Sequence, residues 1–293
     1  MLARGDLLEA RFPILAKWLL APTVAKFVIE APLVARKHRA GNFVIIRIND
    51  TGERIPLTVV ESDSAGGTIT LIVQAVGKTT KALCAMEAGQ AIRDVVGPLG
   101  NPTPIERVGA VACVGGGVGT AELLPIARAL REAGNDVHTI IGARTGELVI
   151  LEDEMRACSS SVTVTTDDGS YGRRGLVTDA LSALLAEHPE ITVVYAIGPL
   201  VMMKAVTGLV EPLGRKSVVS LNTIMVDGTG MCGGCRVTVN GEMKFACVDG
   251  PEFEGSGVDF DELIARNRTY VDLERIADER AACQLTTAQG AAR

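Results

Sequence analysis

The stretch VACVGGGVGTA, from Val111 to Ala121, joins an apolar run to a glycine-rich turn and then to a helical pattern. Glycines in such a turn let the backbone approach a pyrophosphate, whose charge then faces the free N–H groups and positive end of the helix. Because a strand precedes this turn and a helix follows it, the stretch favours a nucleotide site over a merely structural turn. The residues expected to form that site are Gly115, Gly116, Gly117, Gly119 and Thr120.

The sequence beyond this turn alternates between β-branched runs and helical patterns. This alternation predicts a Rossmann-like α/β domain with a right-handed parallel sheet. We expect this NAD(P)-binding domain to span residues 102–222. The predicted strands are 108–114, 137–141, 162–165, 192–197 and 217–221, and the predicted helices are 120–133, 146–157, 176–187 and 202–210.

The ends of the predicted strands supply further candidate cofactor contacts, because ligands of open α/β sheets bind at the carboxyl ends of the strands. The second strand ends near Arg144 without the carboxylate typical of NAD-selective domains. Arg144 could meet a ribose phosphate or stack on adenine, which leaves NADH and NADPH both open. Asp167 and Asp168 follow the third strand, where a plain turn is an equally good interpretation. The other candidates at these ends are Gly198, Pro199 and Met202.

Short strand patterns without long helices between them fill the first third of the chain. Such a series predicts a small antiparallel barrel, with one helix near 79–88. The breaker-rich segment GPLGNP at 97–102 is typical of a boundary, so we expect the barrel domain to span residues 1–101. The apolar run from Phe12 to Ala21 is divided by Lys17 and predicts a short helix or docking segment. The predicted strands are 24–29, 43–48, 57–60 and 68–73.

The most specific feature of the sequence is Asp227-x4-Cys232-x2-Cys235-x11-Cys247. Plant-type [2Fe–2S] sites use C-x4-C-x2-C and a distant fourth cysteine, so the spacing matches with aspartate in the first position. Thiolates suit iron as soft anionic ligands, and a carboxylate can complete the set. The alternative is a zinc site of three cysteines and one acid, disfavoured because no second CxxC or histidine lies nearby. We expect the cluster region to span residues 223–293.

Composition limits the classes of function open to the 293-residue chain. Its net charge of −6 and lack of a basic block argue against a nucleic-acid partner. No run approaches the roughly 18 to 20 apolar residues that would span a bilayer. Seven cysteines without a secretion signal indicate metal ligands rather than disulfides, which favours a cytoplasmic protein. We expect Cys84, Cys113 and Cys158 to be ordinary buried thiols.

The order of barrel, Rossmann-like domain and cysteine loop resembles the ferredoxin reductase superfamily over roughly residues 20–275. Within it the chain resembles the branch of the dihydroorotate dehydrogenase electron-transfer subunit, the sulfide dehydrogenase subunit and the small (alpha) subunit of NADH-dependent reduced ferredoxin:NADP+ oxidoreductase. The segments 27–37 and 52–58 and the aspartate at 227 are particularly similar to the last of these. The dihydroorotate branch normally has cysteine at that position.

The resemblance also assigns flavin contacts. The family's Arg-x-Pro-aliphatic-Ser/Thr motif implies that Arg54 contacts the FAD pyrophosphate and that Leu57 and Thr58, which follow Pro56, meet the flavin ring. A second flavin element matches Gln74, Gly77, Thr79 and Thr80. Independently of the resemblance, a glycine and two threonines at a helix N-terminus make a plausible anion site.

The implied function is electron transfer between NAD(H) or NADP(H), FAD and a [2Fe–2S] cluster held by Asp227, Cys232, Cys235 and Cys247. The cofactors carry the chemistry, so no catalytic acid or base is expected. The implied partner is a larger flavin and iron–sulfur subunit in a heterodimer, with ferredoxin reached through it. The leading hypothesis is the small subunit of a ferredoxin:NADP+ oxidoreductase. The alternatives are the electron-transfer subunit of a dihydroorotate dehydrogenase or sulfide dehydrogenase, and a non-catalytic redox or NAD(P) sensor.

Overall fold

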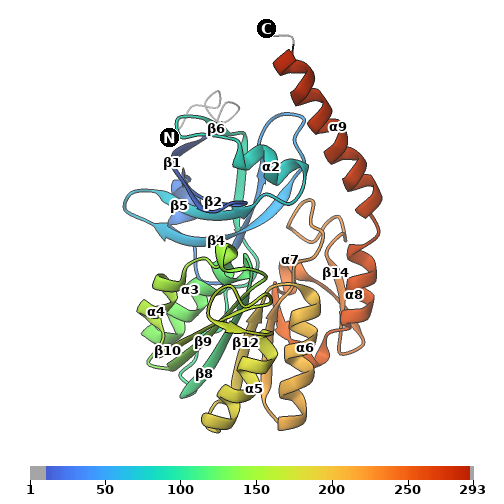
Figure 1. Ribbon diagram of the computed structural model, residues 1–293. Helices are drawn as coiled ribbons and strands as arrows, with labels where there is room; N and C mark the ends of the chain where they lie inside the picture. Colours follow the sequence, from blue (N-terminus) through green and yellow to red (C-terminus); the bar gives the residue numbers. More distant parts are fainter. Residues whose placement is uncertain (1–10, 291–293) are drawn as a thin grey trace.

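The computed structural model describes the backbone of residues 11–290 and the side chains of residues 11–280. Figure 1 shows a barrel of strands above an α/β layer, with the last part of the chain beside both. The helix α9 (Val271–Gly290) rises along the barrel at the end of the described chain.

The barrel is one nearly closed antiparallel sheet in the order β6-β1-β2-β5-β4-β3-β7. Its strands are β1 (Phe12–Ala21), β2 (Val24–Glu30), β3 (Phe43–Arg47), β4 (Ile55–Asp63), β5 (Thr68–Gln74), β6 (Ala91–Ile92) and β7 (Asp94–Leu99). Two short helices accompany them, α1 (Pro32–Ala35) and α2 (Lys78–Cys84). Inward side chains such as Phe27, Ile29 and Leu71 form its core. The four strands predicted here are confirmed, and the predicted helix at 79–88 is present in a shorter form.

Of the two predictions for Phe12–Ala21, the short helix is wrong, whereas the docking segment stays a prediction. This run is the strand β1, which pairs antiparallel with β2 and meets β6 at its start. Ile14 and Ala21 are buried, whereas Leu15 and Leu19 on the same strand are exposed. The apolar run therefore reflects one core face and one uncovered apolar face of a strand, rather than the side of a helix.

The second sheet has the order β11-β10-β9-β8-β12-β13-β16, and its strands run parallel except for β16, which is antiparallel to β13. They are β8 (Ala110–Gly116), β9 (Asp136–Ala143), β10 (Ser161–Thr166), β11 (Arg173–Arg174), β12 (Val193–Ile197), β13 (Lys216–Ser220) and β16 (Glu252–Glu254). The predicted parallel α/β sheet is thus confirmed. The sheet also takes in β16 from the C-terminal region, so that region is joined to the α/β layer; the predicted domain limits remain a prediction.

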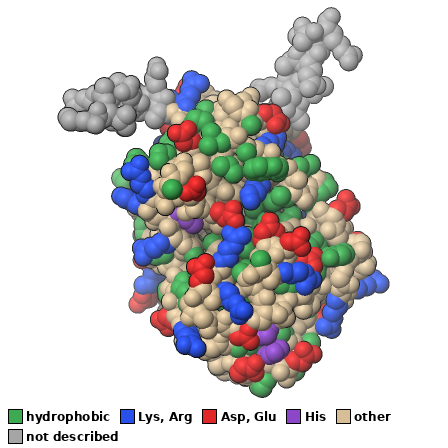
Figure 2. Space-filling model, turned by 90° about the vertical axis from the view of Figure 1, so that its left-hand side faces the viewer, with side chains coloured by type: hydrophobic (Ala, Val, Ile, Leu, Met, Phe, Trp, Pro, Cys, Tyr) green, Lys and Arg blue, Asp and Glu red, His purple; other side chains and the backbone are tan. Residues whose placement is uncertain are grey.

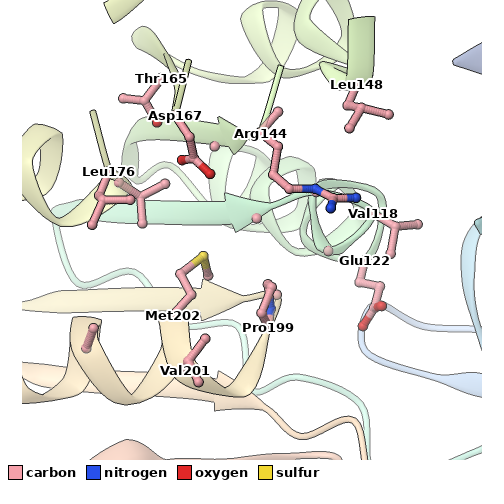
Figure 3. A pocket seen from close by; sticks show the side chains of 18 of the residues that line it. Val118, Glu122, Arg144, Leu148, Thr165, Asp167, Leu176, Pro199, Val201 and Met202 are labelled. Carbon is pink, nitrogen blue, oxygen red and sulfur yellow. The ribbon is translucent and has the colours of Figure 1, made fainter. Parts of the chain in front are cut away.

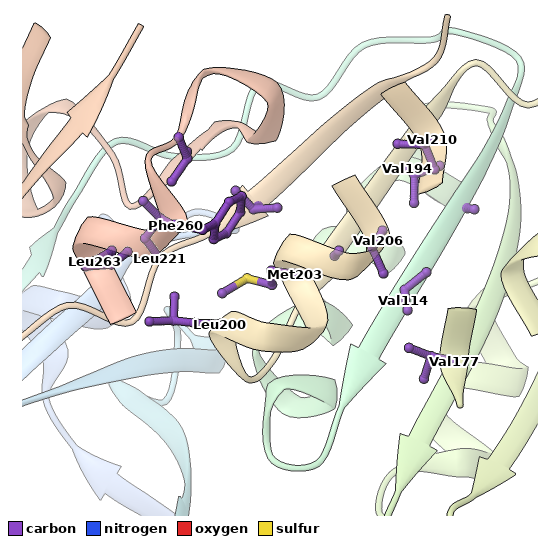
Figure 4. Packing of buried hydrophobic residues seen from close by; sticks show 14 of the residues in the cluster. Val114, Val177, Val194, Leu200, Met203, Val206, Val210, Leu221, Phe260 and Leu263 are labelled. Atoms are coloured by element: carbon purple, nitrogen blue, oxygen red, sulfur yellow. The ribbon is translucent and has the colours of Figure 1, made fainter. Parts of the chain in front are cut away.

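Helices cover both faces of this sheet. One face packs against α3 (Gly119–Glu132) and α4 (Glu152–Cys158) and the other against α5 (Val177–Glu187) and α6 (Leu200–Val210). On the second face Val114, Val194 and Met203 belong to a continuous core that reaches Phe260 and Leu263 in the C-terminal region (Figure 4).

The helix predicted over 146–157 is interrupted. A 3₁₀ turn covers Gly146–Leu148, and Leu151 takes a φ of 60° before α4 begins. A left-handed residue cannot continue a helix, so the predicted segment divides there.

The C-terminal region contains a hairpin of β14 (Arg236–Val239) and β15 (Glu242–Phe245), followed by α7 (Ala246–Asp249) and α8 (Phe260–Asn267). It is tied to the segment after β7: the Asn101 N–H donates to the Gly250 carbonyl at 2.7 Å, and its side-chain amide donates to the Val248 carbonyl at 3.0 Å. These bonds fix the cysteine-bearing region against the end of the barrel.

Positive and negative side chains are interspersed on the face that Figure 2 shows. Among the helices of the described chain, none is long and apolar enough to cross a membrane.

Candidate functional site

A cavity of about 650 Å³ lies where the barrel meets the carboxyl ends of β8, β9, β10 and β12 (Figure 3). Val24 and Gln74 close it on the barrel side, and the glycine turn after β8 forms its floor. Eight of the predicted cofactor contacts line it together: Gln74, Gly116, Gly117, Gly119, Arg144, Gly198, Pro199 and Met202. The fold thus brings four separate segments of the sequence together around one cavity.

The glycine turn has geometric reasons for its composition. A Cβ on Gly119 would come within 2.5 Å of the Ile197 carbonyl oxygen, so α3 starts in direct backbone contact with β12. Gly117 takes a φ of +57°, a left-handed conformation that glycine adopts without strain. Gly115 and Thr120 pack against one another outside the cavity lining: a Cβ on Gly115 would lie 2.8 Å from the Thr120 Oγ1. They shape the turn, while Gly116, Gly117 and Gly119 face the cavity.

The cavity is lined by two opposite charges, Arg144 after β9 and Asp167 after β10. Figure 3 shows Leu176 beside Asp167, whereas the Arg144 guanidinium extends toward Val118. Asp168 lies outside the lining, and its Oδ1 accepts hydrogen bonds from the Ser170 N–H at 3.0 Å and the Ser170 hydroxyl at 2.7 Å. These bonds hold the pKa of Asp168 below its usual value. Of the two adjacent acids, the structure thus brings Asp167 rather than Asp168 to the cavity.

The sequence analysis did not single out Glu122, which lines the cavity from the first turn of α3. Figure 3 shows its carboxyl group on the barrel side of the cavity, away from Asp167. A lone glutamate in a helical pattern is usually a surface charge, so only its position three residues after Gly119 could have suggested it.

The first predicted flavin element lies on or just before β4, outside the cavity lining. Arg54 is exposed, while Pro56, Leu57 and Thr58 are half-buried. Thr58 on β4 pairs with Phe43 on β3. The Thr58 side chain is hydrogen-bonded to Glu122, which joins this element to α3 and the cavity wall.

The second predicted flavin element surrounds the start of α2. The Thr80 hydroxyl accepts from the N–H groups of Val76 and Gly77, at 3.0 Å each. The Thr79 hydroxyl bonds the Glu53 carboxylate, and Lys78 lies 3.3 Å from the same carboxylate. Gly77 is the N-cap of the helix and has nothing within 4 Å of its would-be Cβ, so the backbone there is open to close approach.

The four predicted cluster ligands form two pairs in one loop region. The Sγ atoms of Cys235 and Cys247 lie 3.2 Å apart, and both residues are buried. The Asp227 carboxylate accepts from the Cys232 N–H at 2.8 Å and from the Thr229 N–H at 2.9 Å. Gly228, Gly230 and Gly233 take positive φ values of 75°, 83° and 66°, as a tight loop around a bound group requires.

Pairing of the ligands is what distinguishes a two-iron cluster from a single metal ion. Each iron of a [2Fe–2S] centre takes two protein ligands, whereas zinc gathers four around one point. Within the described residues, no three His, Cys, Asp or Glu side chains gather so as to hold one ion. The adjacent thiols of Cys235 and Cys247 fit the two protein ligands of one iron, and Asp227 and Cys232 hold the first two positions of the plant-type spacing.

Electrostatics differ between the two pairs. The Thr229 N–H and further backbone N–H groups hold the pKa of Asp227 below its usual value, so the carboxylate stays ionised as a ligand must. Burial and the neighbouring Cys235 raise the pKa of Cys247 to about 12. Metal binding at this thiol would have to release its proton.

The cluster loop packs on the barrel. A Cβ on Gly228 would lie 2.7 Å from a Leu99 methyl and 2.8 Å from the Ile45 side chain, so only glycine fits between the loop and strands β3 and β7. The predicted cluster site and the predicted flavin strand β4 therefore lie on neighbouring strands, since β4 pairs with β3.

Sequence comparisons match the two halves of this arrangement. Residues 222–259 match the model of the iron–sulfur cluster binding domain of dihydroorotate dehydrogenase B, and residues 113–208 match that of the oxidoreductase NAD-binding domain. The first match covers all four predicted cluster ligands, and the second covers the glycine turn and both strand ends that carry Arg144 and Pro199.

Whole-chain comparisons extend over nearly all of the protein. It is 51% identical to the dihydroorotate dehydrogenase B electron transfer subunit homolog of Thermotoga maritima, over 91% of this chain and 94% of that one. It is 33% identical to the dihydroorotate dehydrogenase B electron transfer subunit of Bacillus caldolyticus, over 85% and 97%. A chain in the structure of an NADH-dependent reduced ferredoxin–NADP oxidoreductase superposes with a TM-score of 0.88 at 48% identity, over 92% and 98%.

Proposed function

Because the chain belongs to the family of dihydroorotate dehydrogenase B electron-transfer subunits, we propose that it is the small subunit of a ferredoxin:NADP+ oxidoreductase. In this role it passes electrons between NAD(P)H, FAD, a [2Fe–2S] cluster and a larger partner subunit. The single observation that supports the proposal is that the cavity lies between the barrel and the α/β layer, while the predicted cluster loop packs on β3, the neighbour of the predicted flavin strand β4.

Each part of the junction has a distinct task. The turn Gly116–Gly119 and the start of α3 hold the diphosphate of the nucleotide, and Arg144 and Asp167 position its adenosine end. Arg54 and the start of α2 hold the FAD pyrophosphate, and Leu57 and Thr58 contact its ring. Bound FAD supplies the conversion between a two-electron hydride and single electrons. Asp227, Cys232, Cys235 and Cys247 hold the cluster.

The surface around the cluster loop supports an electron-accepting partner. Val226, Met231, Met243 and Val248 lie on or beside this loop with exposed apolar side chains, and Met231 is 87% exposed. Exposed apolar groups rimmed by polar residues are typical of protein interfaces. We propose that the larger flavin and iron–sulfur subunit docks here in a cytoplasmic heterodimer and that ferredoxin exchanges electrons with that subunit.

The second candidate is the electron-transfer subunit of a dihydroorotate dehydrogenase, favoured by the name of the curated relatives. The first candidate is supported by the greater identity to the chain in the oxidoreductase structure, 48%, than to the dihydroorotate dehydrogenase B subunit of Bacillus caldolyticus, 33%. Sulfide dehydrogenase shares the same small-subunit plan, and a redox or NAD(P) sensor would bind the same cofactors without turnover.

The test is an anaerobic absorption and EPR spectrum of the purified chain, with iron, zinc and flavin quantified, before and after NADH and then NADPH. The proposal expects stoichiometric FAD, a two-iron cluster and a rhombic signal from the reduced cluster. The faster nucleotide identifies the donor, and sustained dye reduction by that nucleotide excludes the sensor. Zinc in place of iron, with no flavin, would contradict the proposal. Dihydroorotate oxidation by the co-purified complex would select the second candidate.

A further inference from the structure

Two carboxyl groups lie at the junction of the barrel, α3 and the C-terminal region, and no cofactor contact assigned above uses either. Glu122 stands on α3 and Glu252 on β16, and the negative charge of Glu122 contributes to a raised pKa of Glu252. The Oε1 of Glu252 accepts from the Thr103 hydroxyl at 2.9 Å. Its Oε2 is buried and has no hydrogen-bond partner among the described residues.

Glu122 occupies an unusual place for an acid. Its exposed surface faces the cavity that Gly116, Gly117 and Gly119 also line, and its carboxyl accepts a bond from the Thr58 side chain. The glycine turn at the start of a helix attracts an anionic diphosphate, whereas an ionised carboxylate in the same cavity repels it. A neutral Glu122 removes that conflict.

The surroundings of Glu122 favour the neutral acid. Burial raises the pKa of Glu122 to about 7, and the hydrogen bond from Thr58 only partly opposes it. Burial also raises the pKa of Glu252 to about 7, with the bond from Thr103 opposing and the negative charge of Glu122 adding to the shift. Two like charges held close in a buried site ionise one at a time.

Among the described residues, no lysine or arginine forms an ion pair with Glu122 or Glu252. Arg144 and Asp167 line the same cavity and are of opposite sign. Arg128, further along α3, is bonded to Glu61 instead. A diphosphate arriving at the glycine turn therefore acts on the carboxyl pair as an added negative charge, which favours protonation.

From this geometry we propose that Glu122 lines the nucleotide site as a group that binds a proton, and that the Glu122–Glu252 pair takes up one proton when a dinucleotide binds. The proposal rests on the proposed function only in requiring a nucleotide in this cavity. The proton comes from solvent, and no bond other than that to the carboxyl oxygen is formed. Above neutral pH, where the free protein has lost the proton, binding weakens by up to about tenfold per pH unit.

The experiment is titration calorimetry of the oxidised holoprotein with ADP-ribose, a probe that carries the diphosphate but cannot be reduced. Measurements at about pH 7.5 in buffers of different ionisation enthalpy give the number of protons taken up. We expect several tenths of a proton per ADP-ribose for the natural protein. Glu122→Gln should abolish the uptake and flatten the pH dependence of Kd between about pH 6 and about pH 8.5.

Two further variants keep the test decisive. Glu132→Gln removes the same charge from the far end of α3 and should keep the uptake of the natural protein. Glu252→Gln leaves Glu122 in place but removes its like-charged neighbour, so the uptake should shift to lower pH. This variant carries the test if Glu122→Gln does not fold.

The outcomes distinguish a failure of the role of Glu122 from a failure of the proposed function. Binding without proton uptake by the natural protein, or undiminished uptake by Glu122→Gln, overturns the role of Glu122 and leaves the nucleotide site intact. Failure of the natural protein to bind ADP-ribose overturns the nucleotide site of the proposed function together with this inference.

Discussion

The sulfur atoms of Cys235 and Cys247 lie 3.2 Å apart although 12 positions separate the residues in the chain. The hairpin β14–β15 brings them together, because Cys235 directly precedes β14 and Cys247 stands at the start of α7, just after β15. The Cys232 N–H donates to the Asp227 carboxylate at 2.8 Å. The predicted ligands thus comprise one pair of cysteines and one mixed pair of aspartate and cysteine.

The mixed pair makes Asp227 the first target for mutation. Asp227→Cys should retain a two-iron cluster with a shifted reduction potential, because sulfur replaces a harder oxygen ligand. Asp227→Ala should lose most of the iron, since one iron would keep a single protein ligand. Iron analysis and a potentiometric EPR titration measure both effects. The nearby exposed Glu242→Ala serves as the control. Unchanged iron content and unchanged potential in both Asp227 variants would remove this residue from the ligand set.

After removal of the cluster, the thiols should react with an alkylating reagent in a fixed order. Cys232 is exposed, whereas Cys235 and Cys247 are each 2% exposed. Cys113 is fully buried in the α/β core, where burial and the nearby Cys158 raise its pKa. After chelation of iron, brief alkylation should therefore label Cys232 first and leave Cys113 unlabelled. Mass spectrometry of the digested protein identifies the sites. Equal labelling of Cys232 and Cys113 would mean that the described burial does not hold in solution.

Local patterns predicted most of the fold because strands and helices of the α/β layer carry distinct periodicities. They failed at Phe12–Ala21, where Leu15 and Leu19 leave an apolar outer face that hides the alternation of a strand. The break at Leu151 was also missed, since its left-handed backbone, with a φ of 60°, occurs at a residue that is not glycine and so leaves no local signal.

The candidate site could be predicted from sequence where its function depends on the spacing of particular residues along the chain. The cysteine positions and the glycine turn are such cases. Glu122 and the choice of Asp167 over Asp168 depend on which way a side chain faces after folding. That direction is decided by contacts with Thr58 on β4 and with Ser170, neither of which a local pattern reveals.

Because the backbones of Gly119 and Ile197 are in contact, we predict that adding one methyl group at Gly119 destabilises the protein. In Gly119→Ala, the new Cβ would meet the Ile197 carbonyl oxygen at 2.5 Å and push α3 away from β12. We expect a loss of about 1–3 kcal/mol in the free energy of unfolding and weaker ADP-ribose binding. Chemical denaturation and calorimetry measure the two effects.

Gly208→Ala is the matched control for this methyl group. Gly208 lies within the helix α6, is exposed, and has nothing within 4 Å of its would-be Cβ. Alanine there should stabilise the protein by about 0.5–1 kcal/mol, because glycine is the poorer helix former. A Gly119→Ala protein as stable as the Gly208→Ala protein would contradict the close contact of α3 with β12.

The ion pair between Glu61 and Arg128 predicts how the barrel and the α/β layer separate in acid. Glu61 on β4 accepts a bond from Arg128 on α3 and lies 3.5 Å from Lys26 on β2. Burial opposes ionisation of Glu61, but Arg128 and Lys26 outweigh it and hold the pKa of the carboxyl below its usual value. A lowered folded-state pKa contributes stability above the unfolded value near 4.5, and that stability is lost as the pH falls through the folded value.

Arg128→Met removes the strongest partner of Glu61 and should lower the free energy of unfolding at neutral pH by about 1 kcal/mol, because solvent screens a pair that is partly exposed. The difference from the natural protein should shrink as the pH falls below 4.5 and then through the lowered folded-state pKa of Glu61, where the carboxyl becomes protonated in both proteins. Urea denaturation across this pH range measures it. Arg156→Met, which breaks a pair with Glu152 confined to α4, should cost less and leave the tie between the two layers intact. A difference between Arg128→Met and the natural protein that stays constant down to pH values where Glu61 is protonated would show that Arg128 stabilises through packing alone.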